Sequence, residues 1–133
     1  MVRKPMPNIL IVEDDYQLRR VVANALDDLG FRYDEANNGR EALQKLCQVT
    51  SEGDAYDCIL LDIVMPEIDG WQVLSAIKNN PLWAPMTVVV LTGYANEPGD
   101  VLKVAKYDGV HIEKKGHFIK TVGELLNRLL NAK

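Results

Sequence analysis

The chain lacks the long apolar runs that membrane proteins carry. Its 133 residues hold uninterrupted apolar stretches no longer than those of 9–12 and 88–91, far below the roughly 18 residues of a membrane-spanning helix. The apolar stretch that follows the basic residues near the start breaks at Glu13, too soon for the apolar region of a signal peptide. We therefore expect a cytoplasmic protein with no membrane insertion.

Cysteine and an excess of basic charge are also missing. Cys47 and Cys58 are the two cysteines; they match no metal-ligand spacing and lie in apolar-periodic segments, which predicts plain core or near-core thiols. The 15 Lys and Arg against 19 Asp and Glu give a formal charge of −4. This balance argues against direct binding of nucleic acid and weakly favours a cation site or a basic partner.

The sequence does contain enough apolar material for one core. It is 47% hydrophobic and 26% charged, which excludes a disordered chain. The length is typical of one domain that buries its own core without disulfides or a structural metal. No internal repeat or low-complexity tract divides the chain, so we expect a single domain over residues 1–133.

Short apolar, often β-branched runs alternate with longer helical patterns along the chain. The runs predict strands over 8–12, 31–36, 58–61, 87–91 and 110–113. The helical patterns predict helices over 18–29, 38–48, 70–78, 97–106 and 118–130, with a polar loop over 49–56. This strict alternation is typical of βαβ units around a parallel sheet.

The strands show little polar alternation, which indicates that helices cover both faces of the sheet. Right-handed crossovers then give a doubly wound α/β fold of five strands and five helices. In such folds the binding site lies beyond the carboxyl ends of the strands. We therefore expect the functional residues directly after each apolar run.

Acidic and phosphate-binding side chains do follow these runs. The residues concerned are Glu13, Asp14 and Asp15 after the first strand, Asp62 after the third, Thr92 and Gly93 after the fourth, and Lys114 and Lys115 after the fifth. Carboxylates packed together repel unless a cation lies between them. Magnesium prefers one or two carboxylates together with water and phosphate oxygens, so the pattern predicts a Mg²⁺ and phosphate site. Asp15 is better explained as a helix cap than as a ligand.

Three stretches resemble the signature blocks of two-component response regulator receiver domains. They are Ile-Leu-Ile-Val-Glu-Asp-Asp at 9–15, Leu-Asp-Ile-Val-Met-Pro-Glu-Ile-Asp-Gly at 61–70, and Val-Leu-Thr-Gly-Tyr-Ala at 90–95. The most specific is the block that begins at Asp62. The resemblance covers essentially the whole chain and implies a flavodoxin-like (βα)5 fold with strand order 2-1-3-4-5.

The resemblance also implies a role for each matching residue. Asp62 would accept a phosphoryl group from a sensor histidine kinase or a histidine phosphotransfer protein. Glu13, Asp14, Asp62 and the backbone carbonyl of Val64 would hold Mg²⁺, or Mn²⁺ in its place. The Thr92 hydroxyl and the Gly93 amide would bind phosphoryl oxygens.

A lysine would pair with another phosphoryl oxygen, and the spacing selects Lys114. Thr92 follows Asp62 by 30 residues and Lys114 follows Thr92 by 22, which are separations typical of the family. Strand alternation agrees, because Ile112 and Lys114 share one side of the strand while Lys115 faces the other. The family usually has proline after this lysine, so Lys115 leaves the loop before the last helix undetermined.

The switch residues implied by the family are Thr92 and an aromatic residue on the fifth strand, where this chain has His111. Histidine is smaller and changes charge near neutral pH, which predicts weaker or pH-dependent coupling to a downstream protein target. Since the chain stops at Lys133, just after the last helix, we expect a stand-alone receiver that acts through protein contacts.

A signalling module without enzymatic turnover is therefore the first interpretation. The alternative is a small Mg²⁺-dependent phosphatase of related α/β architecture that forms an aspartyl phosphate. Such enzymes usually carry a second Asp two residues after the nucleophile, where this chain has Val64. A flavodoxin-like cofactor module is disfavoured, because no phosphate-cradling loop follows the first strand.

Overall fold

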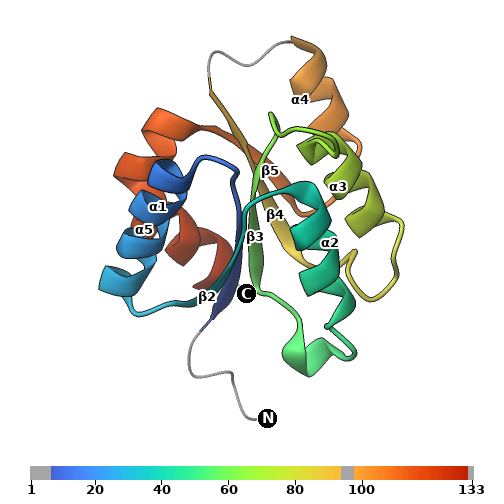
Figure 1. Cartoon of the computed structure of the whole chain (residues 1–133), viewed down its shortest axis with the longest axis horizontal. Coiled ribbons are helices and arrows are strands. Elements are labelled where there is room, and N and C mark those ends of the chain that lie inside the picture. The colour runs from blue at the N-terminus through green and yellow to red at the C-terminus, as the bar shows by residue number, and fades with distance from the viewer. Residues whose placement is uncertain (1–6, 94–97, 132–133) are drawn as a thin grey trace.

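The computed structural model describes residues 7–93 and 98–131. In these residues strands and helices alternate as the sequence predicts (Figure 1). The strands are β1 (Asn8–Val12), β2 (Arg32–Ala36), β3 (Cys58–Asp62), β4 (Thr87–Thr92) and β5 (Val110–Lys114). The helices are α1 (Tyr16–Leu29), α2 (Gly39–Cys47), α3 (Gly70–Lys78), α4 (Pro98–Ala105) and α5 (Lys115–Asn131), with a short 3-10 turn over Glu52–Asp54.

All strands are parallel and lie in the order β2-β1-β3-β4-β5. Helices α1 and α5 cover one face, and α2, α3 and α4 cover the other (Figure 1). Every residue of β3 and β4 is buried, which explains their continuous apolar sequence. The predicted doubly wound fold and strand order are confirmed.

Local sequence signals set the ends of α1. The Asp15 carboxylate accepts a hydrogen bond from the Leu18 amide at 3.1 Å, which makes it the N-cap. Gly30 ends the helix with φ of 81°, a left-handed conformation that costs glycine little. The Asp15 cap places the start of α1 directly after Glu13 and Asp14.

Some element boundaries differ from the sequence expectation. The expected helix start at Glu97 lies outside the described residues, and the predicted loop over 49–56 contains the short 3-10 turn. Strand β5 runs one residue further than predicted, and α5 begins at Lys115 with no intervening loop. Cys58 is buried as expected, but Cys47 is exposed, because α2 turns its Ala42 and Leu46 face toward the sheet.

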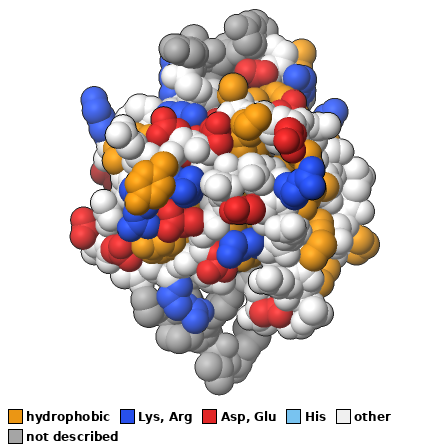
Figure 2. All heavy atoms as spheres, viewed as in Figure 1, with side chains coloured by type: hydrophobic (Ala, Val, Ile, Leu, Met, Phe, Trp, Pro, Cys, Tyr) orange, Lys and Arg blue, Asp and Glu red, His pale blue; other side chains and the backbone are white. Residues whose placement is uncertain are grey.

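Two surface properties bear on partners. Among the described residues, no helix is both long and apolar enough to cross a membrane. On the face shown in Figure 2, basic and acidic side chains are intermixed, and the described residues there form no continuous basic patch.

Candidate functional site at the carboxyl edge of the sheet

Two buried carboxylates lie at the carboxyl ends of neighbouring strands. Glu13 follows β1 and Asp62 ends β3, and these two residues are only 3% and 1% exposed. Asp14 is exposed beside them, and one carboxylate oxygen of each of the three residues lies within 4.8 Å of the others. The pairing of β1 with β3 brings these residues together.

The buried carboxylates are poorly compensated. Burial raises the pKa of Glu13 to about 7, and the neighbouring Asp62 carboxyl adds to the rise, while the Asp15 amide and Lys115 oppose it. The Asp62 Oδ2 atom is buried and has no hydrogen-bond partner among the described residues. Buried acceptors without partners are rare in folded proteins because they lose their hydration without replacement.

The donor set fits a hard divalent cation. Three carboxylates offer only oxygen ligands, and the buried Asp62 Oδ2 atom is left without a hydrogen-bond partner among the described residues. Hard cations such as Mg²⁺ and Mn²⁺ prefer such oxygen ligands. The acidic cluster predicted from the sequence is thus present as a compact group.

In the structure, Lys115 and not Lys114 lies against the buried carboxylates. The Lys115 Nζ atom lies 3.0 Å from Glu13 Oε1 and 3.0 Å from Asp62 Oδ1. Lys114, in contrast, is exposed at the end of β5. Strand alternation does not extend to Lys115, because the chain enters α5 at this residue and its side chain lies against the carboxylates. Burial opposes the charge on Lys115, but the contacts with Asp62 and Glu13 outweigh it and raise its pKa.

Of the other predicted residues, Thr92, Gly93 and Val64 lie at the ends of β3 and β4, whereas His111 lies further back on β5. Thr92 ends β4 beside Asp62 and is 8% exposed, and Gly93 follows it at the surface. The Val64 amide donates to Asp62 Oδ1 at 3.3 Å, while the Val64 side chain is exposed. His111 lies half-buried within β5; burial lowers its pKa, Arg128 lowers it further, and Glu113 opposes the shift.

The comparisons with known proteins agree with this geometry. A family model described as the response regulator receiver domain matches residues 9–118. The chain belongs to this family. It is 28% identical to the response regulator receiver protein CpdR of Brucella abortus, over 96% of this chain and 100% of that protein. It is 40% identical to the transcriptional regulatory protein PcoR of Escherichia coli over 56% of this chain, but spans only 31% of PcoR.

Solved structures resemble the receiver domain closely. The chemotaxis protein CheY4 of Vibrio cholerae superposes with a TM-score of 0.81 at 25% identity, covering 94% of this chain and 99% of that one. The phosphorylated cyanobacterial phytochrome response regulator RcpA gives 0.80 at 27% identity, covering 96% of each chain. Two-component phosphorelay signalling is therefore the function class of this receiver domain, and the phosphatase alternative is not favoured.

A glycine holds the receiver's loop against the acceptor strand. A Cβ atom added at Gly70 would overlap the Asp62 carbonyl oxygen and would lie 2.6 Å from the Ile63 Cα atom. The Gly70 amide donates to the Ile63 carbonyl at 2.9 Å. Only glycine permits this close approach, which folds the segment after β3 back over the strand end.

The sequence places both Lys114 and Lys115 after the fifth strand, and its spacing selects Lys114; the contacts of Lys115 with the carboxylates were not predicted. The absence of the usual proline after Lys114 removes the residue that would separate β5 from α5. Without it, the helix starts at once, and its first residue lies over the strand ends. Two consecutive lysines at this junction are therefore both candidates for the contact with a phosphoryl oxygen.

Proposed function

We propose that this receiver domain accepts a phosphoryl group on Asp62 from a phosphohistidine of a sensor histidine kinase or phosphotransfer protein. A carboxylate oxygen of Asp62 attacks phosphorus, the P–N bond breaks, and the electron pair leaves with the imidazole. The observation that carries the proposal is the buried Asp62 carboxylate, which has an oxygen without a partner and lies against Glu13 and Lys115. Burial keeps this nucleophile away from bulk water.

We assign the supporting roles by position. Lys115, whose ammonium group already contacts Asp62, would bind a phosphoryl oxygen, while the Thr92 hydroxyl and the Gly93 amide would bind another. Glu13, Asp14, Asp62 and the Val64 carbonyl would hold Mg²⁺ or Mn²⁺. When bound, the cation supplies positive charge near the phosphoryl oxygens. Such fixed charges account for most of the catalysis in phosphoryl transfer.

Two similar solved structures support these assignments. RcpA was solved in its phosphorylated form, and the response regulator Rcp1, with a TM-score of 0.77 at 28% identity over 96% of each chain, was solved in a Mn²⁺-bound form. By analogy, we expect both a phosphorylated and a cation-bound form of this chain. Free Cys47 on the surface is typical of a reducing compartment, so we assign the reaction to the cytoplasm.

The output would be a change of protein-binding surface, without enzymatic turnover. Thr92 pairs with Lys114, and His111 lies three residues earlier on the same neighbouring strand. Because the pKa of His111 is lowered, its imidazole is neutral at pH 7. We therefore expect coupling from Thr92 to β5 to weaken only in acid. Amide chemical shifts of β5 after beryllofluoride addition test this, and an identical pH response in His111→Tyr would contradict it.

The phosphorylation test uses acetyl phosphate with MgCl₂ and intact-mass measurement. We expect at most one phosphoryl group on the wild-type chain and none on Asp62→Asn. Asp57→Asn is the matched control, since Asp57 precedes the same strand and binds the Asn8 amide at 2.7 Å. Labelling of Asp62→Asn, or repeated turnover of a phosphoester by the wild-type chain, would contradict the proposal.

A further inference from the structure

An arginine outside the acidic cluster contacts the backbone of Glu13. Arg19 lies in α1, and its Nη1 atom donates to the Glu13 carbonyl oxygen at 2.8 Å. Its Nε atom lies 3.2 Å from Glu35 Oε1, and the guanidinium carbon is 5.4 Å from the centre of the Tyr16 ring. The side chain is only 12% exposed. Arg19 therefore joins the end of β1 to the end of β2.

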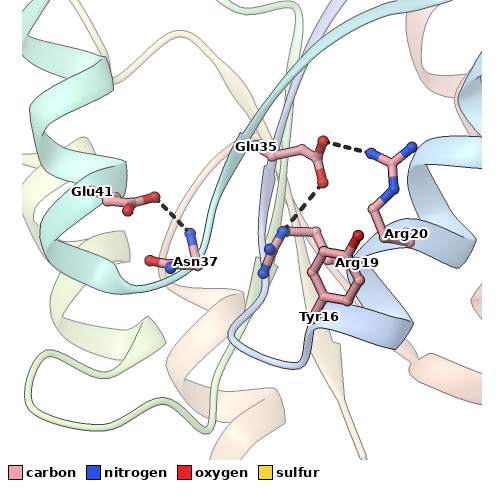
Figure 3. Close-up of a pocket in the computed structure, with 6 residues that line it drawn as sticks. All are labelled: Tyr16, Arg19, Arg20, Glu35, Asn37 and Glu41. Atoms are coloured by element: carbon pink, nitrogen blue, oxygen red, sulfur yellow. Dashed lines mark hydrogen bonds and ion pairs between the residues drawn. The ribbon is translucent and has the colours of Figure 1, made fainter.

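Figure 3 shows the surroundings of this contact. A hollow of about 430 Å³ is open at the surface between α1, β2 and the start of α2, and is lined by Tyr16, Arg19, Arg20, Glu35, Asn37 and Glu41. Arg19 and Arg20 approach the two oxygens of Glu35 from neighbouring positions of α1. Both arginines are thus held by one carboxylate, but only one of them reaches the turn after β1.

The Arg19 contact completes a set of restraints on Glu13. The Glu13 amide donates to the Ala36 carbonyl at 3.1 Å. Its Oε2 atom accepts from the Asp15 amide at 3.1 Å, and its Oε1 atom lies 3.0 Å from Lys115. The carbonyl is the remaining polar group, and Arg19 holds it. Every polar group of Glu13 is therefore restrained by a neighbouring group.

Arg20 provides the internal comparison. It lies 2.7 Å from Glu35 Oε2, closer than Arg19 is to Oε1, and its side chain is 36% exposed. Its other partner is Tyr33 on β2. Arg20 therefore carries the same charge and binds the same carboxylate, but its contacts are directed away from the turn.

We propose that Arg19 is a positioning residue for the cation site. Its guanidinium group, anchored by Glu35, fixes the Glu13 carbonyl so that the Glu13 and Asp14 carboxylates face Asp62. The inference rests on the proposed function, because cation binding is its readout. Groups that orient metal ligands from outside typically contribute 10- to 100-fold in metal affinity.

Positioning and simple electrostatics predict opposite signs. Removing a positive charge near three carboxylates strengthens their attraction for a cation. Removing a contact that orients the ligands weakens cation binding. Arg19→Gln therefore separates the two explanations by the direction of the change, and Arg20→Gln measures the electrostatic part alone.

The experiment is calorimetric titration of the full chain with MgCl₂, together with urea unfolding of each variant. We expect Arg19→Gln to weaken Mg²⁺ binding about tenfold, and Arg20→Gln to leave it unchanged or slightly stronger. Wild-type or stronger binding by Arg19→Gln, or equal weakening in both variants, would overturn the proposal. A wild-type chain that binds no Mg²⁺ would instead contradict the proposed cation site, and the positioning role with it.

A second variant covers the case in which Arg19→Gln does not fold. Arg19→Lys keeps the positive charge but lacks the guanidinium group that contacts both Glu35 and the Glu13 carbonyl, so Mg²⁺ binding should weaken in the same direction and by less. Unchanged or stronger binding by Arg19→Lys would also overturn the proposal. If Arg19 had a purely structural role, each variant that binds Mg²⁺ more weakly would also have a lower free energy of unfolding. The urea measurements show whether the two losses occur together.

Discussion

The two edges of the parallel sheet use similar side chains in opposite ways. At the amino edge, polar groups are well matched: Asp57 accepts from the Asn8 amide at 2.7 Å, and the buried Tyr56 hydroxyl donates to Asp34 at 2.7 Å. At the carboxyl edge, Glu13 and Asp62 are buried side by side, and one Asp62 oxygen lacks a partner among the described residues. The acids of the amino edge accept hydrogen bonds from single neutral donors, whereas the two buried acids of the carboxyl edge share one lysine.

Two lysines repeat this contrast. At the amino edge, Lys78 donates to the carbonyls of Ala84 and Asp108, each at 2.8 Å. It thereby ties the end of α3 to the segments that lead into β4 and β5. At the carboxyl edge, Lys115 contacts two carboxylates that have further capacity for positive charge. The difference indicates that one lysine is structural and that the other can change partners.

The largest expected effect is on the rate of phosphorylation, when each of the two lysines of the carboxyl edge is replaced in turn. We expect Lys115→Ala to slow phosphorylation by acetyl phosphate about 100-fold, the typical cost of one lost electrostatic contact in a transition state. Lys114→Ala is the matched control and should change the rate little, since that side chain is exposed. If Lys114→Ala slowed phosphorylation more than Lys115→Ala, Lys114 would be the lysine that binds the phosphoryl group, as the sequence spacing predicts.

The amino-edge lysine should affect stability instead. Lys78→Met removes charged hydrogen bonds to backbone carbonyls and should lower the free energy of unfolding by about 2 kcal/mol. Burial also lowers the pKa of Lys78, with Asp108 opposing, so part of the loss is offset by removing a buried charge. Urea unfolding measures the change, with exposed Lys120→Met as control. A change in the Mg²⁺ affinity of Lys78→Met would contradict the claim that this lysine acts only on stability.

The buried tyrosine gives a smaller effect with a defined pH dependence. Tyr56→Phe should cost about 1 kcal/mol, the net contribution of one hydrogen bond. Burial and Asp34 raise the pKa of Tyr56, so the unfolded chain loses this proton first as pH rises above about 10. Stability therefore falls above that pH.

In Tyr56→Phe this alkaline loss should be shallower, with the raised pKa of Tyr33 contributing the remainder. Unfolding free energies from neutral to alkaline pH provide the measurement. An alkaline slope as steep as that of the wild-type chain would show that Tyr56 does not carry the effect.

The smallest expected change is a gain at the carboxyl edge. Glu67, in the loop between β3 and α3, has φ of 64°, a left-handed conformation that is unfavourable for residues with a Cβ. Glu67→Gly should raise the free energy of unfolding by about 0.5 to 1 kcal/mol, after allowance for the greater freedom of glycine in the unfolded chain. Its ion pair with Arg40 is exposed and contributes little. Glu67→Ala should give no gain, and an equal gain would exclude backbone strain as the cause.

Sequence patterns were sufficient to predict the strands and helices and to place the candidate site at the ends of the strands. Apolar runs predicted β3 and β4, because both strands are fully buried, and the ends of the strands predicted the positions of Glu13, Asp62 and Thr92. The same reasoning selected Lys114 and did not predict the contacts of Lys115, because the direction of that side chain depends on how β5 joins α5. Arg19 carried no signal either, since its contacts with Glu13 and Glu35 are tertiary.

The most direct test of the contrast between the two edges is whether Mg²⁺ raises the free energy of unfolding through the carboxylates of the carboxyl edge. Urea unfolding should be compared with and without MgCl₂ for the wild-type chain, Asp62→Asn and Asp57→Asn. At a Mg²⁺ concentration 100 times the dissociation constant, the wild-type chain and Asp57→Asn should each gain about 2.7 kcal/mol. Asp62→Asn should gain far less at the same concentration. An equal gain in all three chains, or no gain in any, would contradict the assignment of the carboxyl edge as a cation site.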